Sequence, residues 1–166
     1  MSSSTQQVTK NSLHGMAVFS NYTESPGILG SDGLRVSQVT YVKTYMHELL
    51  RGVGEVQLTY SYLRDGQIDF SGFELFSGGV GDKKGSLILT VVGSVNPENG
   101  VVSAKQLLSY GAGSAELYGY SGEGSYVIKD KQCSFELTLL TLAECGGYYQ
   151  VIDWLFIKSQ SIYIGA

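Results

Sequence analysis

The fold is decided by residues 60–128, which read YSYLRDGQIDFSGFELFSGGVGDKKGSLILTVVGSVNPENGVVSAKQLLSYGAGSAELYGYSGEGSYVI. Short runs of β-branched and aromatic residues recur in this stretch, and each run ends at Gly, Asp-Gly or Asn-Gly. Such runs are typical of consecutive antiparallel strands joined by hairpins. The sequence therefore predicts an all-β protein, a single closed antiparallel β-barrel of about eight strands with a C-terminal extension.

Alternation along these strands predicts which side chains line the barrel. In residues 55–63, apolar and aromatic side chains alternate with polar ones, so we expect Tyr60 and Tyr62 to point inward. In residues 67–77, the more apolar face also carries an acid, Glu74. By the same parity, the interior should also be lined by Phe70, Phe76, Phe135 and Leu137.

The chain divides into three segments. Residues 1–11 are polar and are expected to be disordered, whereas residues 12–141 form the barrel domain. Residues 142–166 contain an apolar run and are expected to form an extension that packs on the barrel. Within the barrel, residues 23–33 are rich in Gly and Ser and predict a loop long enough to fold over a barrel mouth. Residues 47–54 predict a helical turn or an irregular loop.

Two segments leave alternatives open. Residues 34–46 predict a strand, but the pattern does not say which face points inward. Tyr41, Lys43 and Tyr45 share one face. If that face points inward, Lys43 could polarise a ligand carbonyl; if it points outward, it would serve an interface, and we favour the outward orientation. Residues 115–118 predict a strand-like run between glycine-rich turns.

Composition excludes several functional classes. The net charge of −4 gives no basic surface for nucleic acid, and no stretch approaches the ~20 apolar residues of a membrane span. The N-terminal sequence MSSSTQQVTKNS has no apolar run typical of a signal peptide, so we expect a cytoplasmic protein. No Cys/His cluster has metal-ligand spacing, and we expect neither metal nor cofactor. Cys133 fits a buried strand position and Cys145 a turn; a disulfide between them is open.

Three residues are candidates for acid–base chemistry. Glu74 shares its predicted inward face with aromatic residues, where a carboxylate is costly to ionise, so it could act as a general acid or base. It could equally be a structural hydrogen-bond acceptor. Tyr60 could orient a ligand oxygen, although buried tyrosines are more often core residues with a satisfied hydroxyl. His14 is a second acid–base candidate, if its face of the first strand lines the cavity.

Further residues are candidates for contact with a bound ligand. Most of them combine aromatic or apolar character with a predicted inward position. For Met16, Tyr41 and Tyr45 the inward position is one of the alternatives left open, and Trp154 lies in the extension, where it would plug the barrel or pack in the core. The candidates are Tyr62, Met16, Phe70, Phe76, Tyr41, Tyr45, Phe135, Leu137 and Trp154.

Spaced glycines in the chain resemble a known family. Residues 72–95 read GFELFSGGVGDKKGSLILTVVGSV, and residues 111–128 read GAGSAELYGYSGEGSYVI. This pattern resembles the bacterial and fungal DUF3224 proteins over roughly residues 12–141. The resemblance implies a barrel similar to allene oxide cyclase and, more distantly, to dirigent proteins and lipocalins, with an internal cavity and usually oligomeric. The chain departs from the pattern at residues 47–54 and after Thr141.

These observations lead to three functional hypotheses. The first is a cofactor-independent isomerase or cyclase, possibly pericyclic, which folds a hydrophobic biosynthetic intermediate inside the barrel. The second is a non-catalytic, lipocalin-like protein that binds a hydrophobic small molecule. The third is an oligomeric structural protein whose barrel is filled by its own side chains. We favour the first, in a homo-oligomer, either dimer or trimer, that binds neither nucleic acid nor membrane.

Overall fold

The computed structural model describes residues 8–142, which form nine β-strands and one short helical turn. Trp154, Cys145 and the predicted extension, apart from Leu142, lie outside the described residues. The elements are β1 (Val8–Glu24), β2 (Ile28–Leu29), β3 (Arg35–His47), β4 (Leu50–Tyr62), β5 (Ile68–Val80), β6 (Lys83–Val95), β7 (Val102–Leu108), the 3₁₀ helix η1 (Ala115–Leu117), β8 (Tyr120–Lys129) and β9 (Gln132–Leu142).

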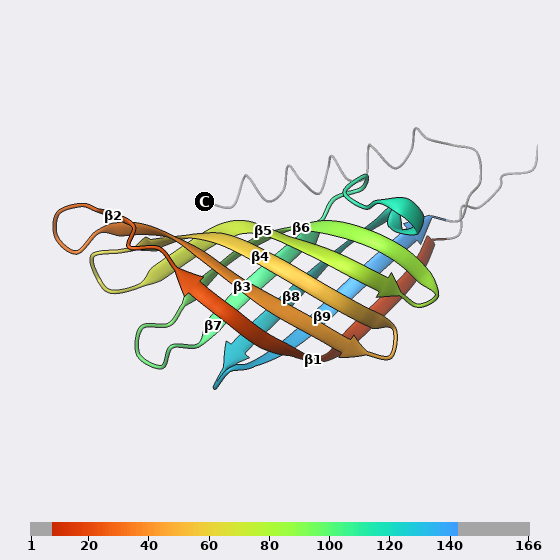
Figure 1. Ribbon diagram of the computed structural model, residues 1–166, viewed down its shortest axis with the longest axis horizontal. Helices are drawn as coiled ribbons and strands as arrows, with labels where there is room; N and C mark the ends of the chain where they lie inside the picture. The colour runs from red at the N-terminus through yellow and green to blue at the C-terminus, as the bar shows by residue number, and fades with distance from the viewer. Residues whose placement is uncertain (1–7, 143–166) are drawn as a thin grey trace, which may run out of the picture.

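The sheet closes on itself. Its strands follow the order β1-β9-β8-β7-β6-β5-β4-β3-β2, and β1 pairs with β3 as well as with β9. All pairings are antiparallel, and β2 is a two-residue addition to the edge of β3. The predicted closed antiparallel barrel of about eight strands is therefore confirmed, with one extra short strand (Figure 1).

The first strand, β1, closes the barrel by pairing with β9 on one side and β3 on the other. It begins at Val8, which pairs with Leu142, so the ordered barrel starts four residues before the boundary predicted at Ser12. Its pairing with β3 shifts register between Ser20 and Thr23, and Asn21 there has φ of 55°. A bulge of this kind bends a strand and strengthens its twist, which suits a strand that leaves one neighbour and joins the other.

The hairpin predicted at residues 64–66 is confirmed, since the Gly66 N–H donates to Leu63 O at 3.0 Å and Gly66 has φ of 86°. The helical turn or irregular loop predicted at residues 47–54 is wrong. A tight turn joins β3 to β4, and β4 starts at Leu50. The glycines at 52 and 54 suggested a break, but glycine inside a strand also marks a place where another group comes close.

Residues 115–118 do not form the strand expected from their composition. Residues 115–117 form η1, and Ala115 has φ of 51°, far from the negative φ of a regular strand. Leu117 is fully buried and packs over β6, where its Cγ lies 3.2 Å from the position that a Cβ at Gly85 would occupy. The turn thus places one apolar side chain over one end of the barrel.

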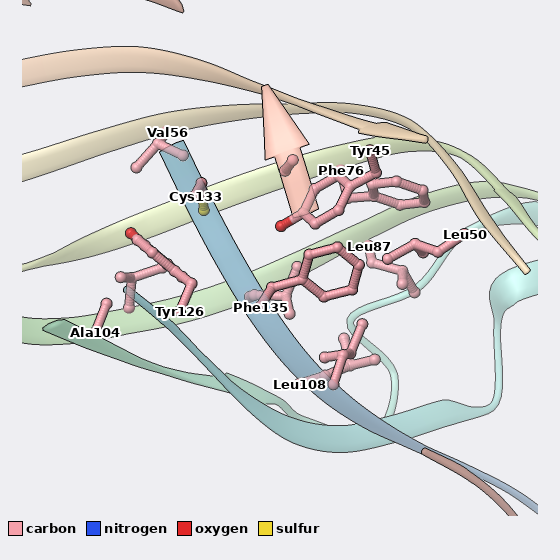
Figure 2. Packing of buried hydrophobic residues seen from close by; sticks show 14 of the residues in the cluster. Tyr45, Leu50, Val56, Phe76, Leu87, Ala104, Leu108, Tyr126, Cys133 and Phe135 are labelled. Carbon is pink, nitrogen blue, oxygen red and sulfur yellow. The ribbon is translucent and has the colours of Figure 1, made fainter. Parts of the chain in front are cut away.

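Aromatic side chains fill much of the barrel interior. Tyr45 packs edge-on against both Phe76 and Phe135, with ring centroids 5.7 and 5.0 Å away. Figure 2 shows these rings together with Leu50 and Leu87. Tyr45 comes from β3, Phe76 from β5 and Phe135 from β9, so these contacts cross the interior. The core therefore ties opposite walls of the barrel to each other.

Two adjacent leucines provide a test of this assignment. Leu50 is 1% exposed in the core, whereas Leu49 in the preceding turn is 46% exposed. Leu50→Ala should lower the free energy of unfolding by about 2–5 kcal/mol, because it leaves a cavity. Leu49→Ala should change it by less than about 0.5 kcal/mol. Urea denaturation of both variants measures the difference; equal losses would contradict the strand start at Leu50.

Candidate functional site

The centre of the barrel holds a fully buried ion pair. Lys43 Nζ on β3 lies 2.8 Å from Glu74 Oε2 on β5, and neither side chain is exposed. Gly54 on the intervening strand β4 makes room for the acid, because a Cβ there would lie 2.1 Å from Glu74 Oε1. The glycine that looked like a break in the sequence is thus required by the carboxylate beside it.

Two further donors complete the surroundings of the carboxylate. The Tyr45 hydroxyl donates to Glu74 Oε1 at 2.6 Å, and Gln106 Nε2 donates to Oε2 at 2.5 Å. A buried carboxylate is tolerated when it is paired and hydrogen-bonded. The sequence led us to expect a lone acid among aromatic rings. The structure corrects this, because Lys43, Tyr45 and Gln106 all contact Glu74.

The ammonium group of Lys43 is less well satisfied than its partner. It has one polar partner among the described residues, Glu74 Oε2 at 2.8 Å, and its other N–H bonds find no acceptor there. Instead, Nζ lies 3.7 Å from the centroid of the Tyr126 ring and 5.1 Å from that of Tyr45. Cation–π contacts partly compensate a desolvated ammonium, but its donors remain unfilled. We call Lys43, Tyr45, Glu74, Gln106 and Tyr126 the central cluster.

Phenols and a thiol in and around the central cluster are held in their neutral forms. The Tyr41 and Tyr126 hydroxyls lie 2.5 Å apart, and burial raises the pKa of both well above the ordinary value. Burial likewise raises the pKa of the free thiol of Cys133 to about 11, although nearby Lys43 opposes the shift. At neutral pH these groups are therefore hydrogen-bonding groups rather than nucleophiles.

A second polar group sits where the first strand ends. Glu24 Oε1 accepts hydrogen bonds from Ser37 Oγ at 2.6 Å, Arg35 Nη2 at 3.1 Å and the Tyr62 hydroxyl, and Oε2 accepts one from the Tyr22 hydroxyl at 3.1 Å. Arg35 also stacks over the Tyr62 ring at 3.9 Å. We call these five residues the Glu24 cluster. Partial burial opposes ionisation, but hydrogen bonds from Ser37, Tyr62 and Tyr22, with the charge of Arg35, hold the pKa of Glu24 below its ordinary value.

The structure brings together some of the candidate residues and separates others. Glu74 lies at the centre as expected, but the tyrosine on its carboxylate is Tyr45. Tyr60 is buried and stacks on Phe70 with centroids 5.3 Å apart, and burial raises its pKa to about 12. Tyr62 is half-buried in the Glu24 cluster. The remaining candidates that face inward and are buried are Tyr41, Tyr45, Phe70, Phe76, Phe135 and Leu137.

Two candidates lie on the wrong side of the wall. His14 is exposed and Met16 is 52% exposed, because the inward positions of β1 are those of Leu13 and Ala17. The expectation that His14 and Met16 line the cavity is therefore wrong. Met16 instead borders an open hollow of about 440 Å³ on the outer surface, together with Met46. A second hollow, of about 550 Å³, lies at the turn around Arg64 and is also external.

Sequence reasoning left open or missed the residues that contact the Glu74 carboxylate. The face carrying Lys43 was favoured as outward, and the structure turns it inward. Gln106 was not singled out, yet it shares one face of β7 with Ala104 and Leu108, and all three are buried. That shared face was the available signal. Glu24 was assigned to a loop, and nothing in the local sequence marks its four donors.

The comparisons with known proteins agree with this architecture. The pattern of the family described as "Protein of unknown function (DUF3224)" matches residues 13–139. The chain belongs to the DUF3224 family. A crystal structure of a DUF3224 protein of unknown function from Shewanella oneidensis MR-1 superposes with a TM-score of 0.60 at 18% identity, covering 80% of this chain and 97% of that one. A search of curated proteins found no match.

Two negative findings concern residues 8–142 alone. Within them no group of three or more His, Cys, Asp or Glu side chains is placed to hold a metal ion. The same residues include no helix with the length and apolar character needed to cross a membrane. Among these residues of the DUF3224 chain, three of the five buried polar or charged side chains, Lys43, Glu74 and Gln106, belong to the central cluster.

Breaking the central ion pair should destabilise the barrel. Lys43→Met leaves Glu74 buried without its counter-charge, and we expect a loss of about 3–5 kcal/mol in the free energy of unfolding. The double variant Lys43→Met/Glu74→Gln should recover most of that loss. Urea denaturation measures both, with the exposed Lys105→Met as a control that should shift by less than about 0.5 kcal/mol. A double variant no more stable than Lys43→Met alone would rule out the coupling.

The Glu24 cluster should contribute to stability in a pH-dependent way. Because folding lowers the pKa of Glu24 below its unfolded value, its contribution is present above that value and is lost as the pH falls through the folded pKa. Glu24→Gln should therefore show a shallower loss of stability than the wild type between about pH 5 and about pH 3. Denaturation at a series of pH values measures this, and Glu98→Gln, at an exposed position, should follow the wild type.

Proposed function

We propose that this protein is a non-catalytic binding barrel for an apolar small molecule that carries one acidic or carbonyl oxygen. The observation that carries the proposal is the Lys43 ammonium, which is fully buried and has Glu74 as its one polar partner among the described residues, so that it keeps N–H bonds without an acceptor. A buried donor without a partner costs free energy, about 1–3 kcal/mol for a neutral group and more for a charged one. An oxygen brought by a ligand would remove that cost.

The groups around Lys43 fit an apolar molecule with a polar end. The rings of Tyr45 and Tyr126 face the ammonium, and Phe135 packs against Tyr45. Ligand sites of this kind combine a mostly apolar lining with a few convergent polar groups. Because the interior is closely lined by its own side chains, a ligand would take the place of rings that rotate aside. Candidates are Tyr126, which lies over the ammonium, and Phe135, which packs against Tyr45.

The isomerase or cyclase that the sequence favoured is less well supported than simple binding. A general base needs a free lone pair directed at the proton it removes. In the central cluster, Tyr45 and Gln106 donate to the Glu74 carboxylate and Lys43 lies against it. His14 lies on the outer surface. Acid–base chemistry at Glu74 would require the ligand to displace one of these donors first.

One observation favours a different candidate function. The inward side chains already pack against one another across the barrel, as the Tyr45–Phe135 and Lys43–Tyr126 contacts illustrate. A barrel filled in this way could be a structural unit that acts through its outer surface. This candidate predicts no saturable binding in the interior, so the ligand experiment separates the two.

The test uses parinaric acid, a fluorescent polyene fatty acid, and the alcohol of the same chain. We expect saturable binding of both, with the acid bound about tenfold or more tightly, since a hydrogen bond to a charged group contributes about 1.5–3 kcal/mol. Glu74→Gln should bind the acid more tightly than the wild type, because the Lys43 charge is no longer shared. The double variant Lys43→Met/Glu74→Gln should lose the preference for the acid. Fluorescence titration measures each dissociation constant.

The control is Lys105→Met, which removes a lysine from the outer face of β7 and should leave the preference for the acid unchanged. Absence of saturable binding in the folded wild-type protein would contradict the proposal and would support the filled structural barrel. An equal preference for the acid in the double variant would show that Lys43 is not the anchor.

A further inference from the structure

The outer wall of the barrel carries a continuous apolar face. Its five members are large side chains that point away from the core, with exposures of 39–58%. They are Phe73 and Leu75 on β5, Ile88 and Val92 on β6, and Leu107 on β7. We call these residues the outer apolar face. Continuous apolar surface of this kind usually marks a contact site.

Strand register places the five side chains next to one another. Leu75 is directly opposite Ile88, and Thr90 lies opposite both Phe73 and Leu107. Residues directly opposite on one face of an antiparallel pair have Cβ atoms about 4.5–5.5 Å apart. The five residues thus surround Thr90 without a charged side chain between them. Charges lie at the margin, where Glu55 is opposite Leu75, Lys105 is opposite Val92 and Glu123 is opposite Leu107.

We propose that the outer apolar face is the docking site of this chain's own C-terminal run, Val151–Ile157. The run reads VIDWLFI and lies beyond the last described residue, Leu142. Six of its seven side chains are apolar, so the run would be stabilised by burial against another apolar surface. It also carries Asp153 within it and Lys158 directly after it, which can meet the charges of opposite sign at the margin of the face.

Geometry puts the face within reach of the run. One row of directly paired residues crosses the wall from β9 to β5 through Thr138, Glu123, Leu107, Thr90 and Phe73. Four strand spacings of about 4.8 Å make this row ~19 Å long, and Leu142 lies four residues, or ~13 Å, along β9 from Thr138. Residues 143–150 provide eight residues, which span up to ~28 Å when extended. The run can therefore start over any part of the face.

Attachment favours this occupant over a second copy of the chain. A segment tethered by a short flexible link has an effective concentration in the millimolar range. A second molecule at micromolar concentration competes poorly against it for the same surface. Another apolar area of the outer wall, at Met16 and Met46, is a worse match for reach, because Met16 pairs with Ser134, eight residues along β9 from Leu142. It supplies the matched control.

The test uses the full-length chain and the emission of Trp154, the one tryptophan in the sequence. In the wild type we expect blue-shifted emission that is protected from acrylamide quenching and does not change on dilution. Phe73→Lys/Ile88→Lys should shift the emission to the red and raise the quenching constant at least twofold. Met16→Lys/Met46→Lys, with the same added charge on the outer wall, should leave both unchanged. Circular dichroism checks that each variant keeps its strands.

Three results would overturn the proposal. Wild-type emission like that of free tryptophan would show that the run is not covered. An equal shift in the Met16→Lys/Met46→Lys variant would show that the outer apolar face is not the site. Loss of protection on dilution, with a dimer by light scattering at high concentration, would assign the cover of Trp154 to a second copy instead. None of these results depends on ligand binding at Lys43, so this proposal and the binding function fail separately.

Discussion

Burial of the Lys43–Glu74 pair is the constraint on which the rest of the interior depends. Removing two charges from water costs several kcal/mol for each ion, and their attraction offsets that cost only with good geometry and further hydrogen bonds. The barrel brings the ammonium from β3, the carboxylate from β5, an amide donor from β7 and the Tyr126 ring from β8 to one point. Position 54 is a glycine whose absent Cβ would overlap the Glu74 carboxylate. Local sequence choices thus follow from a contact across the barrel.

The two polar clusters solve the problem of a buried carboxylate differently. Glu74 has no exposure and relies on an ammonium partner, whereas Glu24 keeps 22% of its side chain in contact with solvent and takes most of its support from neutral hydroxyls. Both carboxylate oxygens of Glu24 accept hydrogen bonds, and Arg35 is held in place by stacking on the Tyr62 ring. In the central cluster it is the cation that is left short of partners. This asymmetry is why the centre, and not the Glu24 cluster, is the better candidate for a ligand.

Sequence reasoning worked where one physical signal dominated. Turns at Asp-Gly and Asn-Gly located the hairpins, and clean alternation placed Tyr60, Phe76 and Phe135 inside. It failed where both faces of a strand were mixed. The inward position of Lys43 depends on partners from strands far away in the chain, which no local pattern contains. His14 was misplaced because the small inward residues Gly15 and Ala17 look less like a core than His14 and Met16 do.

Closure through the first strand has a consequence for how the chain folds. β1 is synthesised before β9, yet Val8 of β1 pairs with Leu142 of β9. One edge of β1 therefore stays without hydrogen-bond partners until β9 has been synthesised. Contacts between residues so distant in sequence carry a large loop-closure entropy, and folds dominated by them form in milliseconds to seconds rather than microseconds. Until β9 is in place, any sheet formed by the earlier strands has two unpaired edges, at β1 and at β8. The barrel forms only after translation has passed its final strand, so the interval before closure is the time at which this chain is most exposed to aggregation.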